Sequence, residues 1–412
     1  MKLLRQRYLP EGLLLMVLCT VAAAAHEHGS GGAKLSAEKM WAEMLGKQDI
    51  LAVSAAFDAN GRLWRARVKD GRVLVDHSDD LGATFSPAIA TNGDKEAIGA
   101  EGDARPKIIT SSDGAIYVSY TQLLSKPYSG NIRFSRSLDG GKTFSAPITV
   151  NDNHDIIGHR FDALAAGADG KVYLAWLDKR DEAAAKKQNE AYAGSALYYA
   201  VSKDRGATFG ANIKVVDHAC ECCRVAMALG GDGVPALLWR HVYDGNVRDH
   251  AFTKLEGNIR PVRVSHDNWT VEACPHHGPA LAAGPDGRYH AVWFDNAPQN
   301  HGLFYARSQD GGTTFGTPMK FGNDLAQPSH PDILSLGKVV LLAWKEFDGE
   351  KSAVYTMRSL DSGTTWSTPR RAAETADASD YPTLIGHSDR AYLSWNTLKE
   401  GYRVIPLNDD PL

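Results

Sequence analysis

One octapeptide pattern, Ser-x-Asp-x-Gly-x-Thr-aromatic, occurs five times in this chain of 412 residues. The five copies span residues 78–85, 137–144, 202–209, 308–315 and 359–366. Their first residues are separated by 59, 65, 106 and 51 positions, so one unit between the third and fourth copies lacks the octapeptide. A period of this length indicates one supersecondary unit that is repeated along the chain and stacks on its neighbours.

A second repeat accompanies the first. Seven segments consist of a turn followed by alternating apolar and polar residues, and most of them end in Trp; they are residues 61–66, 114–120, 170–176, 233–239, 287–293, 337–344 and 389–395. Period-two alternation after turn residues is typical of antiparallel strands. We therefore expect an all-β chain, a β-propeller of four-stranded antiparallel sheets with seven blades of about 52 residues each, and with six blades as the alternative. The last unit, residues 381–407, shows only three strands, and an N-terminal segment could supply the fourth.

The octapeptides resemble the Asp boxes of the sialidase (BNR-repeat) superfamily, and the repeats cover nearly all of the chain after its first 50 residues. The resemblance implies that each box lies in the turn between the third and fourth strands of a blade. The Asp carboxylate can accept backbone N–H groups within such a turn, and the Gly permits a positive φ. The boxes are therefore expected to be structural rather than catalytic.

The first 25 residues read as a secretory signal peptide. Lys2, Arg5 and Arg7 precede an apolar run over residues 13–25 that ends in small residues. Such a run is too short to span a bilayer, and its three-part pattern is that of a cleaved signal. We expect an exported protein, periplasmic or secreted.

The rest of the chain divides into two parts. Residues 26–49 form a tail with a short amphipathic helix predicted at 34–46, and residues 50–412 form the propeller domain. No later segment is apolar enough to cross a membrane. The formal net charge of −4 offers no basic footprint for a nucleic-acid partner.

Propeller topology places the start of each first strand and the end of each second strand at one mouth of the central channel, opposite the Asp boxes. A concave mouth of this kind is a common ligand site. The residues expected there are unusually polar: Arg105, His159, Arg160, Asp162, Asp178, Arg180, His218, Cys220, Cys222, Cys223, Arg224, Arg240, His241, Cys274, His276, His277, Asp295, His330, Asp332, Glu346, Asp380 and Tyr381. Either they pair with one another and hold the blades together, or they bind a small molecule, a glycan or a metal.

The cysteines favour a metal. Apart from Cys19 in the signal peptide, the chain has four, which are expected to lie close together in neighbouring blades. Thiolate and imidazole ligands suit copper or zinc, and the candidate ligands are Cys220, Cys222, Cys223, Cys274, His276 and His277, with His218 nearby. In an oxidising compartment two structural disulfides in any of three connectivities, one disulfide with a partial metal site, or a redox role remain alternatives. A bond between the adjacent Cys222 and Cys223 is disfavoured, because neighbouring side chains point to opposite sides of a strand.

The family resemblance also implies a chemistry. Sialidases hold the substrate carboxylate with three arginines, and they use an acidic acid/base together with a Tyr nucleophile activated by a Glu. The positions that resemble this set are Arg105, Arg160, Arg224, Glu346 and Tyr381. The first blade has no Arg at the corresponding place and so departs from the family's pattern. An exo-α-sialidase-like hydrolase, a glycan-binding protein and a disulfide-held scaffold are therefore kept as alternatives to the metal-binding propeller.

Overall fold

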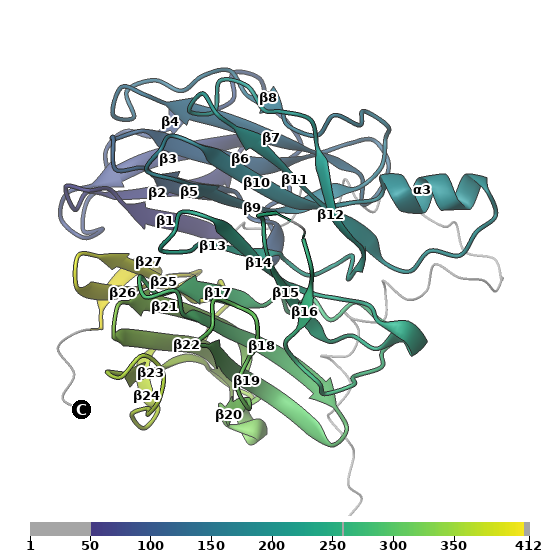
Figure 1. Ribbon diagram of the computed structural model, residues 1–412. Helices are drawn as coiled ribbons and strands as arrows, with labels where there is room; N and C mark the ends of the chain where they lie inside the picture. Colours follow the sequence, from purple (N-terminus) through teal and green to yellow (C-terminus); the bar gives the residue numbers. More distant parts are fainter. Residues whose placement is uncertain (1–50, 258, 408–412) are drawn as a thin grey trace, which may run out of the picture.

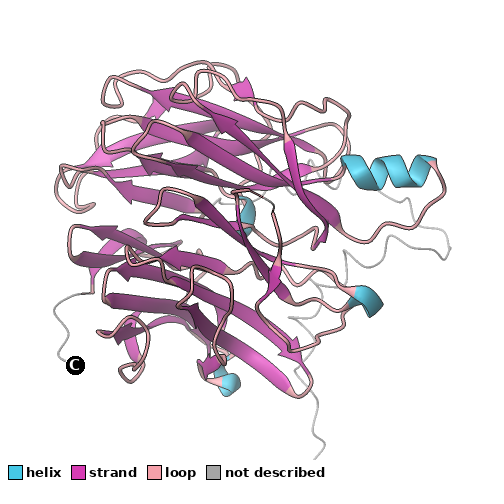
Figure 2. Ribbon diagram, in the orientation of Figure 1, coloured by secondary structure: helices cyan, strands magenta, loops and turns pink. Residues whose placement is uncertain are grey.

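The computed structural model describes residues 51–257 and 259–407. The predicted signal peptide, tail and short helix lie outside these residues. Within the described ranges, 27 strands form seven antiparallel sheets (Figures 1 and 2). Six of these sheets have four strands and one has three. Among the described residues, no helix has the length and apolar character needed to cross a membrane.

Each blade is a meander whose strands follow one another in chain order. Blade one contains β1 (Val53–Phe57), β2 (Leu63–Lys69), β3 (Arg72–Ser78) and β4 (Ile89–Ala90). Blade two contains β5 (Lys107–Thr110), β6 (Ile116–Leu123), β7 (Gly130–Ser137) and β8 (Ile148–Thr149). Blade three contains β9 (His159–Ala166), β10 (Val172–Asp178), β11 (Ser195–Ser202) and β12 (Ile213–Ala219). Blade four contains β13 (Ala226–Leu229), β14 (Pro235–Arg240), β15 (His250–Lys254) and β16 (Val262–Arg263).

The remaining blades repeat this plan. Blade five contains β17 (Ala280–Ala283), β18 (Tyr289–Ala297), β19 (Asn300–Ser308) and β20 (Met319–Phe321). Blade six contains β21 (Ser329–Leu336), β22 (Val339–Phe347), β23 (Ser352–Ser359) and β24 (Arg370–Thr375), and blade seven contains β25 (Thr383–His387), β26 (Arg390–Thr397) and β27 (Gly401–Pro406). Over residues 51–257 and 259–407, the helical elements are η1 (Gly102–Ala104), α3 (Arg180–Lys187), η2 (Asp244–Asn246) and η3 (Asp324–Ala326). Figure 1 shows α3, between β10 and β11, standing out from the strands.

The first strands of the seven blades form a closed ring. Each contacts the first strand of the next blade, from β1 through β5, β9, β13, β17 and β21 to β25, which contacts β1 again. The seven predicted turn-and-strand segments become the second strands. The structure therefore confirms seven blades rather than six.

The tryptophans of the second strands form the core between blades. Trp176, Trp239, Trp293, Trp344 and Trp395 are the largest fully buried side chains. Trp176, for example, packs in one cluster with Tyr117 and Phe134 of the preceding blade. Burial of large aromatic area is a dominant favourable contribution to folding, which explains why five of the seven second strands carry a Trp here.

The five Asp boxes connect third and fourth strands, as predicted. In the second box, Asp139 accepts from the backbone N–H of Thr143 at 3.0 Å, from its hydroxyl at 2.6 Å and from the Ser137 hydroxyl at 2.7 Å. Gly141 has φ +80°, and an added Cβ would collide with the Trp64 ring of blade one. Each box therefore fixes its own turn, and this one also packs against the neighbouring blade. Blade four has no box between β15 and β16, which accounts for the 106-residue interval.

A buried ion pair joins the last blade to the first two. Arg105 donates to both carboxylate oxygens of Asp380, at 2.8 and 2.6 Å. The same carboxylate accepts from the Val53 N–H at 3.1 Å, and Arg105 donates to the Val53 carbonyl at 3.0 Å. Arg105 and Asp380 are each 6% exposed. The fourth strand that an N-terminal segment was expected to add to blade seven lies outside the described residues.

Candidate metal centre

The four cysteines lie in two loops that link successive blades. Cys220, Cys222 and Cys223 lie between β12 and β13, and Cys274 lies between β16 and β17. Both loops lead into first strands on the mouth side of the ring, because the Asp boxes and the turns between first and second strands lie on the other side. The backbone N–H of Cys220 donates to the Arg240 carbonyl at 2.8 Å, which ties the first loop to the end of β14.

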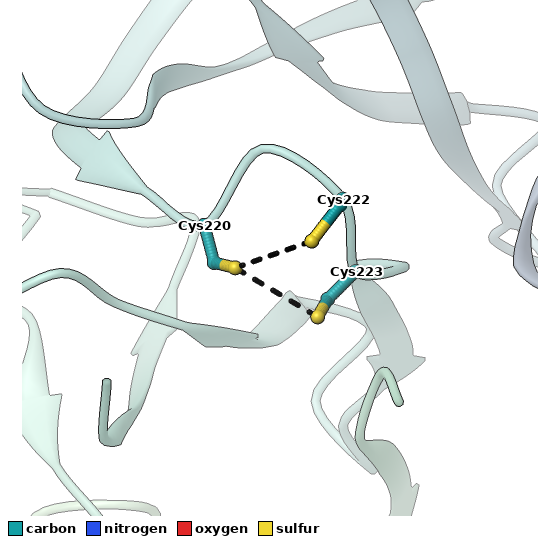
Figure 3. A group of neighbouring side chains, drawn as sticks. All are labelled: Cys220, Cys222 and Cys223. Atoms are coloured by element: carbon teal, nitrogen blue, oxygen red, sulfur yellow. Dashed lines mark hydrogen bonds between the residues drawn. The ribbon is translucent and has the colours of Figure 1, made fainter. Parts of the chain in front are cut away.

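The first loop brings three sulfur atoms together (Figure 3). The Sγ of Cys220 lies 3.8 Å from that of Cys222 and 3.8 Å from that of Cys223. All three Sγ atoms lie within 4.8 Å of one another. The three side chains are only 1, 5 and 2% exposed. A disulfide requires about 2.05 Å between sulfurs, so these are free thiols.

The expectation that Cys222 and Cys223 point to opposite sides is wrong. That rule holds for a strand, but Glu221 and Cys222 form a turn and Cys223 a bend. The turn directs both sulfurs toward Cys220, as Figure 3 shows. A single short loop therefore presents three buried thiols to a common point.

The second loop adds a more exposed group. One ligand atom each from Cys222, Cys274 and His276 lie within 4.8 Å of one another. Cys274 and His276 are exposed, whereas Cys222 is buried. Cys222 therefore belongs to both groups and links the buried sulfurs to the surface.

His277 does not join the cysteines. Its ring stacks between Phe294, at 4.2 Å between centroids, and His330, at 4.4 Å. His330 in turn stacks on Tyr381 at 3.4 Å. Burial lowers the pKa of His277 to about 4. His218 is also occupied elsewhere, because its Nδ1 lies 2.9 Å from the Ala193 carbonyl.

Positive charge surrounds the buried sulfurs. Arg248 Nη1 donates to the Cys220 Sγ at 3.2 Å. Hydrogen bonds from the Cys222 and Cys223 thiols, and then the charges of Arg240 and Arg248, hold the pKa of Cys220 well below its ordinary value. Cys220 is therefore the first of the three to become a thiolate. The sequence analysis did not predict Arg248. The one feature that pointed to it is a positive charge between β14 and β15, in the blade that both cysteine loops flank.

Two of the predicted arginines are held by neighbouring groups. Arg105 binds Asp380, as described above. Arg224 donates to Asp103 at 3.3 Å and to the carbonyls of Pro279 and Pro331 at 2.9 and 3.0 Å. These contacts join loops of blades two, four, five and six.

Arg160 differs from these two. Among the described residues its side chain has no hydrogen-bond partner, and its guanidinium lies 4.8 Å from the centre of the Phe161 ring. Burial lowers the pKa of Arg160, and the charges of nearby acidic groups, which include Cys222 and Cys274, oppose that effect. Among the described residues, Arg160 therefore has no hydrogen-bonded anion, and its charge lies near Glu101 and the cysteine loops.

Glu346 and Tyr381 do not form the pair that a sialidase mechanism needs. Glu346 accepts from the Trp344 indole at 2.7 Å and from the Asn323 N–H at 2.8 Å. No hydrogen bond joins it to Tyr381 within the described part of the chain. Burial raises the pKa of Tyr381, so its hydroxyl is protonated at neutral pH.

A carboxylate cluster lies in the same region. Oxygens of Asp249, Asp267 and Asp295 lie within 4.8 Å of one another. Arg240 lies 3.8 Å from Asp295, and Arg263 binds Asp249. Burial raises the pKa of Asp295 to about 7. Asp267 is held by neutral donors, the Trp293 indole and the Asn300 amide.

Outside the mouth, a groove of about 550 Å³ lies on the Asp-box side between blades five and six. Its lining includes Tyr305, Arg307, Phe315 and Trp366. It is built from the box turns themselves and contains none of the predicted site residues.

Comparison with known proteins establishes the fold. No family model matches the chain, and no curated protein matches it. Among solved structures, a protein of unknown function from Dyadobacter fermentans shares 17% identity over 76% of this chain and 95% of its own, with a TM-score of 0.52. An ulvan lyase of polysaccharide lyase family 25 shares 12% identity over 88% of this chain and 94% of its own, with a TM-score of 0.55. A Hadza microbial sialidase shares 15% identity over 82% of this chain and 74% of its own, with a TM-score of 0.48.

At these identities the similarity shows the fold alone. The chain is a β-propeller, as the resemblance of its Asp boxes implies, and its seven sheets match the seven turn-and-strand repeats. What it binds has to be argued from its own residues.

Proposed function

We propose that this chain is an exported β-propeller that binds a soft transition-metal ion, copper(I) in preference to zinc, through Cys220, Cys222 and Cys223. The observation that carries the proposal is the convergence of three buried thiol sulfurs within 4.8 Å of one another. Thiolate ligands select soft ions such as copper(I) and zinc. Burial protects the bound thiolates from water and oxidants.

Coordination number and charge favour copper(I). Structural zinc is almost always held by four ligands, whereas the buried group supplies three. Three thiolates with one cuprous ion carry a net charge of −2, and the guanidinium groups of Arg240 and Arg248 act on Cys220 from close by. Arg248, together with Arg240, which also faces Asp295, offsets part of that net charge within a buried site, where an unbalanced charge is costly.

The first experiment is a metal analysis with a free-thiol count, made on protein purified from the export compartment. We expect one copper per chain that survives dialysis and is lost in Cys220→Ser and Cys223→Ser. His277→Gln is the matched control, because it removes a neighbouring predicted ligand that the structure places elsewhere, and it should keep the copper. Protein with no metal and no free thiols would instead support structural disulfides.

A second candidate function rests on Arg160. Within the described residues its Nε has no hydrogen-bond partner, and a guanidinium at the channel mouth suits the carboxylate or sulfate of an anionic sugar. One similar structure, the family 25 ulvan lyase, is bound to a glucuronic acid–sulfated rhamnose repeat. Because Arg105 and Arg224 are already paired, we propose binding of a glycan rather than sialidase hydrolysis.

The glycan proposal has its own tests. An anionic oligosaccharide should bind to wild type in calorimetry and bind more weakly to Arg160→Met. A fluorogenic sialoside should not be turned over, by wild type or by Tyr381→Phe. Turnover by wild type that is lost in Tyr381→Phe would restore the sialidase alternative.

A further inference from the structure

We infer that Cys222, Cys274 and His276 form an outer loading position, and that a copper(I) ion passes from it to the buried sulfurs while remaining bound to Cys222. The inference rests on the proposed copper site. It follows from two ligand groups that share one sulfur. Each group has its ligand atoms within 4.8 Å, and Cys222 is common to both.

The two groups differ in access. Cys220 and Cys223 are 1 and 2% exposed, so an ion cannot reach them directly from solvent without the loop moving. Cys274 and His276 are exposed. A copper ion carried by a small molecule or a partner therefore meets the outer pair first, and Cys222 is the only member of that group that also reaches inward.

The loop is anchored just after the outer pair. His277 is stacked between Phe294 and His330, and the Gly278 N–H donates to Asp103 at 3.0 Å. These contacts fix the end of the loop in the ring of blades. Cys274 and His276 are thereby held beside Cys222 rather than left at the tip of a free segment.

The transfer is a ligand exchange with no change of oxidation state. The copper–Cys222 bond is kept throughout. The bonds from copper to the Cys274 sulfur and to a His276 ring nitrogen break, and bonds to the sulfurs of Cys220 and Cys223 form. Any proton still on Cys220 or Cys223 leaves to water, and the released Cys274 thiolate takes up a proton from water.

The direction of transfer follows from ligand chemistry. The outer group offers two sulfurs and one nitrogen, whereas the inner group offers three sulfurs. Copper(I) prefers the softer set. The inner position also has a positive charge beside it, because Arg248 donates to Cys220 at 3.2 Å. An ion therefore moves inward and is retained there.

The test separates loading rate from final affinity. Full-length protein is mixed anaerobically with the coloured copper(I)–bicinchoninate complex, and loss of colour is followed in a stopped-flow instrument and then at equilibrium. The variants are wild type, the double variant Cys274→Ser/His276→Gln, and His301→Gln as an exposed-histidine control. We expect the double variant to load roughly tenfold more slowly, while its final copper content and equilibrium affinity stay at the wild-type level. His301→Gln should match wild type in both.

The outcomes distinguish the two claims. If wild type takes no copper from the complex, the proposed function itself fails. If wild type binds copper and the double variant loads equally fast, the outer position plays no part in loading. If the double variant loses the retained copper altogether, Cys274 and His276 are permanent ligands, and the two-position account is overturned.

Discussion

The five Asp-box turns and the channel-mouth loops lie on opposite sides of the same blades, and they obey different constraints. Every box repeats one set of contacts: the Asp carboxylate accepts from a Ser hydroxyl, from a backbone N–H and from a Thr hydroxyl. At the mouth each blade presents different residues. The boxes show a turn that five blades share, and the mouth shows where the sequence varies from blade to blade. Blade four is the extreme case, because it lacks a box and is flanked by both cysteine loops.

The largest expected effect tests whether some of the polar residues at the mouth are structural. Asp380→Ala leaves the buried Arg105 charge without its partner, which should cost about 3–5 kcal/mol of unfolding free energy. Chemical denaturation measures the loss. The double variant Arg105→Met/Asp380→Leu removes both charges and should regain most of the stability. Equal losses in the single and double variants would mean that the pair does not hold the ring.

The next largest effect concerns two glycines of the second Asp box. Gly140 and Gly141 are adjacent, with φ of +71° and +80°. Alanine at 140 has open space, so only the positive φ is strained, at about 1 kcal/mol. Alanine at 141 also meets the Trp64 ring, and we expect about 3 kcal/mol in total. Equal unfolding temperatures for Gly140→Ala and Gly141→Ala would contradict the packing of this box on blade one.

Acid should weaken the core between blades. His290 is fully buried, its Nδ1 lies 2.8 Å from the Tyr305 hydroxyl, and burial lowers its pKa to about 4. The unfolded chain takes up this proton near pH 6.5, so the stability is present above that pH and is lost as pH falls toward 4. The loss should be about 3 kcal/mol, from a pKa difference of about 2.5 units.

The check is the slope of unfolding free energy against pH. His290→Gln should flatten this slope between about pH 6.5 and 4, whereas the exposed His301→Gln should leave it unchanged. An unchanged slope in His290→Gln would show that His290 does not titrate in this way.

The smallest effect concerns the metal site. Arg248→Met removes the donor to the Cys220 sulfur and should weaken copper(I) binding roughly tenfold, without loss of stoichiometry. Competition with a coloured copper(I) chelator measures the change. Arg263→Met is the control. It removes another cation of the same blade, one that binds Asp249 and not the sulfur. A weaker site in both variants would mean that fold stability, and not the contact to sulfur, is responsible.

The repeats made the fold predictable. Two independent periodic signals, the boxes and the second strands, gave the blade register, and the register alone put the cysteine loops side by side. The contacts within the mouth were not predictable in the same way. Asp380 lies 275 positions from Arg105 in the sequence, and no local pattern joins them.

Two details of the site depended on backbone and packing that the sequence does not display. The turn at Glu221 and Cys222 directs two neighbouring sulfurs to one side, against the alternation of a strand. His276 has φ +52°, and the ring of His277 is captured by Phe294 and His330 from other segments. Adjacent histidines with the same chemistry therefore have different surroundings.

X-ray absorption at the copper edge, on protein loaded with one equivalent of copper(I), identifies the atoms bound to the metal. We expect a first shell of sulfur atoms alone, from Cys220, Cys222 and Cys223, and the same spectrum in Cys274→Ser/His276→Gln. A first shell of nitrogen and oxygen, or protein that retains no copper, would contradict the proposed copper site.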